Sequence, residues 1–219
     1  MNKNDTDIER GITDFKRLKD KCPWLQDFNK QAKGSRAILQ PYWDAYTARV
    51  SAEEMTISIE LSAFLAMLCQ INKPAGILDL GSGFSSMVFR LYARDAKPQP
   101  AVWTVDDSPE WLIKTRSYLQ ENGLPIGETD VWEHFDEEKI ASPSLIFYDL
   151  GRMELRIEAL SRVLAMARKF NSMVVADDFH KEFYRAHAIS SLAEKGCEHY
   201  SLRVLTEDKF SRYAELIFP

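Results

Sequence analysis

Residues 77–89 read ILDLGSGFSSMVF, and this stretch decides the fold. An apolar run that contains Asp79 leads into Gly81 and Gly83, and a second apolar run follows. A strand, a tight turn and a helix explain this pattern, because glycine lets a turn approach a neighbour that a Cβ would block. We therefore predict a strand over 77–80, a glycine turn, and a helix over 85–94.

The chain beyond residue 76 alternates between strand and helix patterns. Repeated strand–helix units of this kind predict a parallel sheet with helices on both faces. The last two predicted strands have no helical pattern between them, so we expect an antiparallel hairpin. The further predicted strands lie at 101–105, near 130–134, at 144–149, 172–176, 200–205 and 213–218, and the helices at 109–122, 154–170 and 183–195.

Residues 1–50 have a different character, with charged amphipathic segments and an aromatic cluster of Tyr42, Trp43 and Tyr46. We interpret them as a helical cap outside the main sheet, and residues 51–219 as the main domain. The aromatic cluster favours core packing, and a lid over a planar substrate is the alternative. A capping box at residues 51–54 predicts a helix from 51 to about 70, with Met55 facing inward.

Composition limits the classes of function. The chain has 219 residues, a net charge of −5 and three widely spaced cysteines, Cys22, Cys69 and Cys197. An acidic chain lacks the basic field that nucleic-acid binding needs. The polar start is no signal peptide, and the apolar stretch 61–70 is too short to span a bilayer. We expect a cytoplasmic protein with free thiols and no nucleic-acid or membrane partner. A homodimer is one possible oligomeric state.

Ligands of such sheets bind at the carboxyl ends of the strands, where the glycine turn lies. A dinucleotide needs G-x-G-x-x-G, but Ser86 stands at the third position. S-adenosylmethionine (SAM) tolerates that change, because it has no pyrophosphate to hold. Asp106 ends the next strand and can accept hydrogen bonds from ribose hydroxyls, a feature that NAD and SAM share. From these residues alone, three alternatives remain: a turn that binds SAM, a turn that binds NAD, and a turn that binds no ligand.

The glycine turn combined with VDDSPEWL at 105–112 resembles the motifs of class I SAM-dependent methyltransferases. The resemblance covers about residues 51–219. It implies a Rossmann-like, doubly wound, seven-stranded and mostly parallel α/β sheet, and transferase activity with SAM as cofactor. The position that contacts adenine would be Glu133 or His134. The cofactor-binding residues that the resemblance implies are Asp79, Gly81, Ser82, Gly83, Phe84, Ser85, Asp106, Asp107 and Glu133.

A second group of acids follows the next two strands. Asp149 ends the strand at 144–149, and Asp177 and Asp178 follow the strand at 172–176. Acids gathered at one sheet edge repel each other unless a cation or a proton intervenes, which suggests Mg²⁺. His180 offers another mechanism as a general base oriented by an aspartate. Helix capping by the acids is the third interpretation.

This second group resembles, more loosely, the site of catechol, caffeoyl-CoA and macrocin type O-methyltransferases. The resemblance implies Asp149, Asp177 and Asp178 as metal ligands. Together with His180 as the alternative base, we predict Asp149, Asp178 and His180 as the catalytic residues. Arg152 stands where the caffeoyl-CoA type has a lysine, and an arginine cannot act as a base at ordinary pH.

The sequence lacks [DN]-P-P-[YFW] after the strand at 144–149, and it lacks a Pro-Cys nucleophile. These absences point away from nucleic acid and toward a small hydroxylated acceptor. We predict O-methylation of a small molecule, with Mg²⁺ as an optional aid. The alternatives are a metal-independent transferase acting on nitrogen or on a protein side chain, and a non-catalytic partner protein with this fold.

Overall fold

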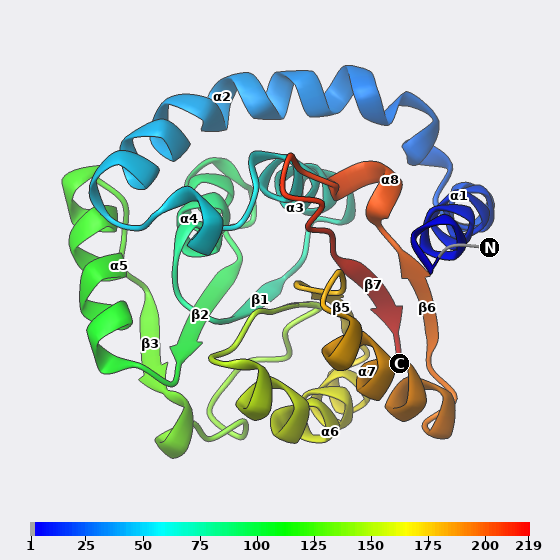
Figure 1. The fold of residues 1–219 in the computed structure, drawn as a ribbon. Helices are drawn as coiled ribbons and strands as arrows, with labels where there is room; N and C mark the ends of the chain where they lie inside the picture. Colours follow the sequence, from blue (N-terminus) through cyan, green and yellow to red (C-terminus); the bar gives the residue numbers. More distant parts are fainter. Residues whose placement is uncertain (1–2) are drawn as a thin grey trace.

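The computed structural model describes residues 3–219, and the side chains from residue 6 onward (Figure 1). The first two residues of the predicted cap lie outside the described residues. One mixed sheet forms the centre of the molecule. Its strands are β1 (Gly76–Leu80), β2 (Ala101–Asp106), β3 (Glu128–Val131), β4 (Leu145–Tyr148), β5 (Met173–Ala176), β6 (Glu198–Ser201) and β7 (Glu215–Phe218).

The strand order is β3-β2-β1-β4-β5-β7-β6. The first five strands of this order are parallel, and β7 is antiparallel to both β5 and β6. The predicted parallel sheet and the predicted terminal hairpin are therefore confirmed. After β1, the chain forms β2 and β3 on one side of β1. It then crosses to the other side of β1, where it forms β4. The point between β1 and β4 is thus the topological switch point, where such sheets bind ligands.

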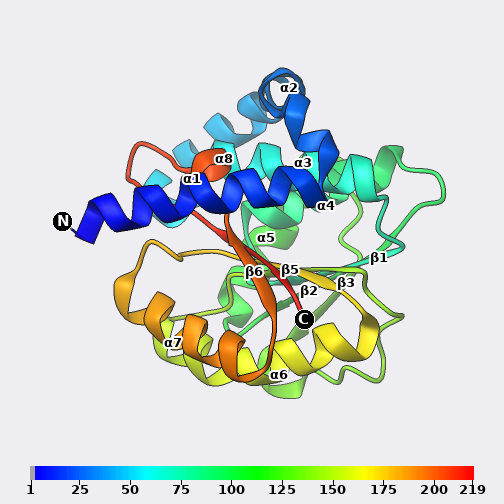
Figure 2. The ribbon, with the colours of Figure 1, turned by 90° about the vertical axis from the view of Figure 1, so that its right-hand side faces the viewer.

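Helices cover both faces of the sheet (Figure 2). The helices α6 and α7 lie on one face, and α3, α4 and α5 lie on the other with α1 and α2 farther out. The helices are α1 (Lys3–Lys21), α2 (Phe28–Arg49), α3 (Ile59–Asn72), α4 (Phe84–Asp95), α5 (Pro109–Glu121), α6 (Met153–Phe170), α7 (Glu182–Glu194) and α8 (Arg203–Thr206), with short 3-10 helices η1 (Pro23–Asp27), η2 (Glu53–Met55) and η3 (Trp132–His134).

The helix α3 explains how the amino-terminal segment attaches to the sheet. Every residue from 61 to 69 is buried, because the sheet covers one side of α3 and α2 covers the other. The Trp43 indole of α2 donates a hydrogen bond to the Ile57 carbonyl oxygen at 2.9 Å. Trp43 and Tyr46 belong to the same buried cluster as Phe64. The aromatic residues of α2 are therefore part of one core with the main sheet.

The prediction for the start of α3 was wrong. The helix begins at Ile59, and the Ser58 hydroxyl accepts the capping hydrogen bond from the Leu61 amide at 3.0 Å. The segment with the predicted capping box instead forms η2, and Met55 is 76% exposed. Ser51 and Ser58 can each cap a helix. The helix begins after Ser58 because the apolar run that follows Ser58 is buried.

Two smaller predictions also differ from the structure. The third strand ends at Val131, and the residues up to His134 form η3 instead of continuing it. The segment between the last two strands contains α8, which the sequence pattern did not indicate.

The three cysteines are free thiols. In residues 3–219, no helix has the length and apolar character needed to cross a membrane.

Candidate functional site

A cavity of about 660 Å³ opens at the carboxyl ends of the central strands. This volume falls within the roughly 300–1,000 Å³ typical of small-molecule sites. The residues that directly follow β1, β2, β4 and β5 form much of its wall, as expected at a switch point. These strand-end residues are Gly81, Ser82, Gly83, Asp107, Asp149, Asp177 and Asp178, together with Asp106 at the last position of β2.

The two glycines of the turn have different reasons to be glycine. Gly81 has a left-handed φ of 110°, and a Cβ there would lie 2.4 Å from the Asp149 carbonyl oxygen. Gly81 is therefore required by the protein's own packing. Gly83 has an extended φ of 166°, and the nearest atom to a Cβ would be the Tyr46 hydroxyl oxygen at 3.6 Å. Among the described residues, no atom lies close enough to require glycine at 83, which lines the cavity.

Asp79 lies beneath the turn and not in the cavity wall. Its carboxylate is fully buried and accepts hydrogen bonds from the hydroxyls of Ser85 at 2.8 Å, Ser86 at 2.5 Å and Thr104 at 3.0 Å. Burial raises the pKa of Asp79 to about 6, although these hydroxyls and Arg90 favour the charged form. The predicted direct contact of Asp79 with a cofactor does not fit this position, because Asp79 holds the turn from below.

Asp106 presents an ordered carboxylate to the cavity. Its Oδ2 accepts a hydrogen bond from the Ser82 amide at 2.5 Å, and its Oδ1 accepts one from the Ser108 amide at 2.8 Å. Burial raises its pKa, and these amides act in the opposite direction. A carboxylate has about four lone-pair sites, so further acceptor capacity remains. The Ser82 hydroxyl is buried without a partner among the described residues, which leaves a second polar group for a ligand.

Other predicted cofactor residues divide into two groups. Asp107, Phe84 and Ser85 line the cavity, with Phe84 packed 5.5 Å from the Tyr46 ring centroid. Glu133 and His134 are exposed and do not line the cavity, so the structure does not bring the predicted Glu133 together with the other residues. The reason is local: β3 ends early, and η3 turns these side chains outward.

The predicted base His180 also lies outside the cavity wall. Asp178 has a left-handed φ of 64°, which turns the chain sharply before His180. The imidazole packs edge-on against Tyr213, and its Nδ1 lies 3.6 Å from Asp178 Oδ1. Burial lowers the pKa of His180 despite the nearby Asp178 carboxylate. This position does not support the predicted role of His180 as the base.

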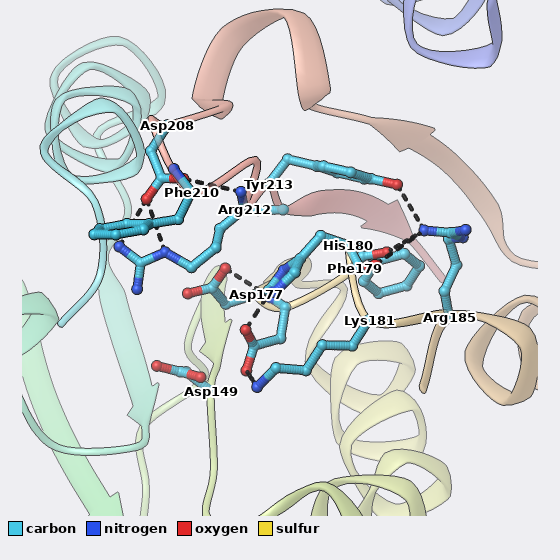
Figure 3. Close-up of polar contacts among 12 residues, drawn as sticks. Asp149, Asp177, Phe179, His180, Lys181, Arg185, Asp208, Phe210, Arg212 and Tyr213 are labelled. Atoms are coloured by element: carbon cyan, nitrogen blue, oxygen red, sulfur yellow. Dashed lines mark hydrogen bonds and ion pairs between the residues drawn. The ribbon is translucent and has the colours of Figure 1, made fainter. Parts of the chain in front are cut away.

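The three predicted metal ligands meet at one place, but a cation of the protein already lies between two of them. Figure 3 shows Asp149 and Asp177 pointing toward the same space, with Arg212 and the end of Lys181 on opposite sides. Arg156 of α6 places Nη2 at 2.7 Å from Asp149 Oδ1 and Nη1 at 2.8 Å from Asp178 Oδ2.

These charges shift the pKa values of the three aspartates in different directions. Burial raises the pKa of Asp149 to about 6 against the opposing effect of Arg156. Burial, followed by the charges of Asp149 and Asp178, raises the pKa of Asp177 well above its ordinary value. Burial acts in the same direction on Asp178, but Arg156 and Lys181 outweigh it and lower the pKa of Asp178.

The arrangement does not fit the predicted metal site. Within residues 3–219, no group of three His, Cys, Asp or Glu side chains is placed to hold a metal ion. The guanidinium of Arg156 is bound to one carboxylate oxygen of Asp149 and one of Asp178, so a positive charge already lies where a metal ion would be expected. The sequence motifs do not single out Arg156, although its position four residues before the core residue Leu160 places it on the inward face of α6.

Residues from outside the parallel sheet complete the wall. Tyr46 comes from α2, Glu54 and Met55 from η2, and Arg212 from the loop before β7. Arg212 holds η2 in place, because its Nη1 donates to the Glu54 carbonyl oxygen at 2.7 Å and its Nε donates to Asp208 Oδ2 at 2.7 Å. The sequence carried no local signal for this contact, which joins segments far apart in the chain.

Comparison with known proteins gives structural matches only. No family model and no curated protein matches the chain. The SAH-bound methyltransferase PaMTH1 of Podospora anserina matches with a TM-score of 0.61 and 14% identity, over 83% of this chain and 87% of that one.

Two further solved structures agree. A Bacillus cereus O-methyltransferase in complex with SAH matches with a TM-score of 0.61 and 17% identity, over 84% of this chain and 89% of that one. The O-methyltransferase TomG of Streptomyces achromogenes in complex with SAM matches with a TM-score of 0.60 and 15% identity, over 82% and 87%. The chain therefore has the Rossmann-like α/β fold of class I SAM-dependent methyltransferases.

Proposed function

We propose that this protein is a SAM-dependent methyltransferase and that the strand-end cavity binds SAM. The observation that carries the proposal is the pairing of Gly83 with Asp106 on one wall. Asp106 offers an ordered carboxylate for the ribose hydroxyls, and Gly83 leaves the turn backbone open toward the cavity. Ser82 also lines the cavity, and its hydroxyl has no partner among the described residues. Structural neighbours with this fold hold SAH or SAM.

The acceptor would bind at the opposite wall, near Asp149, Asp177 and Arg152. Arg152 is exposed at the cavity, where it could orient an acceptor or stabilise an oxyanion. The carboxylate of Asp177 lines the cavity and is held by the Asp178 amide at 2.6 Å. We infer that Asp177 takes the proton of an acceptor hydroxyl. The net charge of −5 favours a small molecule over nucleic acid as the acceptor, and we place the reaction in the cytoplasm.

In the proposed reaction, the acceptor oxygen attacks the SAM methyl group in line with the sulfur. The bond from sulfur to methyl carbon breaks as the bond from oxygen to carbon forms, and SAH leaves as a neutral thioether. The hydroxyl proton passes to Asp177. Because the sulfonium is already reactive, the protein contributes mainly proximity and alignment.

The test is SAH formation from SAM with a panel of small hydroxylated and amine acceptors. We expect an oxygen acceptor to support SAH formation. We expect Asp106→Asn to raise the KM for SAM and to leave the KM for the acceptor unchanged. Glu110→Gln is the matched control, since Glu110 is an exposed acid nearby in the chain that does not line the cavity. Turnover only with amines would replace the oxygen acceptor by nitrogen. No SAH with any acceptor, together with no SAM binding, would contradict the proposal.

A further inference from the structure

Arg156 is almost entirely buried at the acceptor end of the cavity, with 4% of its side chain exposed. It projects from the first turns of α6 toward the loop that follows β4. Besides the two carboxylates, it donates hydrogen bonds to the carbonyl oxygens of Asp149 at 3.1 Å, Leu150 at 3.3 Å and Gly151 at 3.0 Å. All three guanidinium nitrogen atoms therefore have acceptors, and their positions are fixed.

A divalent ion bound by Asp149 and Asp178 would lie beside carboxylate oxygens that Arg156 already holds. Mg²⁺ binds oxygen ligands at about 2.0–2.1 Å in octahedral geometry, and Ca²⁺ at about 2.3–2.6 Å. Here Asp149 Oδ1 and Asp178 Oδ2 face the guanidinium, and Lys181 Nζ lies 2.7 Å from that same Asp178 oxygen. A metal ion at this place would lie beside the positive charges of Arg156 and Lys181, which repel it. The repulsion that suggested Mg²⁺ is offset by these two cations at Asp149 and Asp178, and it still raises the pKa of Asp177.

We propose that Arg156 is the built-in cation of this site and that methyl transfer here needs no divalent metal ion. Its role is that of a positioning residue: it holds Asp149, Asp178 and the turn after β4, and it leaves Asp177 to the acceptor. The part of the inference that concerns methyl transfer rests on the proposed function. The part that concerns metal binding stands on the geometry of Arg156 alone.

One consequence concerns the acceptor. A metal ion would hold two neighbouring oxygen atoms of the acceptor at once. Each guanidinium nitrogen of Arg156 already has an acceptor in the protein, so without a metal ion no described group at this end of the cavity requires such a pair. The site therefore suits an acceptor with one reacting hydroxyl, bound through Asp177 and the walls of the cavity.

The first test measures metal binding without any reaction. Mn²⁺ is titrated into the wild-type protein and into Asp149→Asn/Asp178→Asn, and free Mn²⁺ is followed by electron paramagnetic resonance. We expect the two titrations to coincide, because the wild-type protein has no Mn²⁺ site at these aspartates. Any Mn²⁺ bound elsewhere on the acidic surface is common to both proteins and cancels in the comparison. A wild-type Mn²⁺ site that the double variant lacks would overturn the proposal. SAH binding to the wild-type protein is measured in the same buffers, and its absence would sink the proposed function while the Mn²⁺ result still stands.

The second test removes the guanidinium. We expect Arg156→Met to leave two unpaired carboxylates and to gain a Mn²⁺ site, seen as new Mn²⁺ uptake and a rise in melting temperature with Mn²⁺. Arg162→Met, on the same helix but paired with Glu137, should gain neither. A folded Arg156→Met that takes up no Mn²⁺ would overturn the assignment of Arg156. Should that variant fail to fold, the wild-type titration and the effect of EDTA on SAH formation decide: unchanged turnover supports the proposal, and turnover lost in EDTA and restored by Mg²⁺ overturns it.

Discussion

Gly81 and Asp149 touch through their main chains: a Cβ at Gly81 would lie 2.4 Å from the Asp149 carbonyl oxygen. The first glycine of the turn therefore serves the packing of β1 against the end of β4. The second glycine, Gly83, meets no such neighbour, because a Cβ there would lie 3.6 Å from its nearest atom. The open space at the turn is thus next to Gly83, where we place the cofactor.

This difference predicts opposite effects for two alanine substitutions. Gly81→Ala should lower the free energy of unfolding by about 2 kcal/mol or more, since it combines a left-handed φ with a backbone clash. Gly83→Ala should change stability by less than about 0.5 kcal/mol and weaken SAH binding by at least about tenfold, or about 1.4 kcal/mol. Urea denaturation and calorimetric titration measure the two effects. Equal loss of stability in both variants would disprove the separation of roles.

The burial of Arg156 predicts a large loss of stability when its charge is removed. Arg156→Met should lower the free energy of unfolding by about 3–5 kcal/mol at pH 7, because it leaves buried carboxylates without a partner. Arg162→Met removes a half-exposed ion pair with Glu137 and should lower it by less than about 1 kcal/mol. Denaturant unfolding of the two variants gives the comparison. Similar small losses in both would show that Arg156 is not an essential partner of Asp149 and Asp178.

The raised pKa of Asp79 predicts a pH dependence of stability. Its pKa is about 6 in the folded protein against 3.8 for an ordinary aspartate, so between these values the folded state binds a proton that the unfolded chain has lost. The free energy of unfolding must then decrease as the pH rises through this window, by at most about 3 kcal/mol. Asp79→Asn removes this contribution.

The measurement is urea denaturation of wild type and Asp79→Asn from pH 4 to pH 7. Other titrating groups are common to both proteins and cancel in the difference. We expect the wild type to lose stability relative to Asp79→Asn as the pH rises, with most of the change complete near pH 7. Parallel curves for the two proteins would show that Asp79 is charged in the fold throughout.

The contact of Arg212 with η2 predicts local opening at the cavity entrance when it is removed. Arg212→Leu should increase hydrogen exchange in residues 53–57, because the carbonyl oxygens of Glu53 and Glu54 lose their hydrogen bonds from the guanidinium. Lys209→Met is the control, since it removes only an exposed ion pair to Glu53. Mass spectrometry of exchanged peptides follows the effect. Exchange that rises equally in both variants would mean that Arg212 does not hold the segment.

The sequence predicted the sheet and most helices because those signals are local. Apolar runs of strand length alternate with helical patterns, and the Ser108 hydroxyl caps α5 through the Trp111 amide at 3.3 Å, at the expected start of that helix. The start of α3 could not be resolved locally, because Ser51 and Ser58 both fit a cap and only the packing of α2 over α3 distinguishes them.

The site was predictable only as far as the strand ends. Asp106, Asp149, Asp177 and Asp178 reach the cavity because parallel strands end at one edge of the sheet. What each carboxylate contacts depends on partners from other elements, and Arg156 changes the chemistry of two of them. Glu133 lies outside the cavity wall because β3 ends at Val131, before the predicted end near residue 134, and periodicity does not fix strand ends that closely.

The most direct test of the central claim is calorimetric titration of SAH into the wild-type protein, Asp106→Asn and Gly83→Ala, each in EDTA. We predict micromolar binding to the wild type without metal, and a loss of at least about tenfold in each variant while both remain folded. Wild-type protein that binds neither SAH nor SAM, or variants that bind as the wild type does, would contradict the assignment of the strand-end cavity as a SAM site.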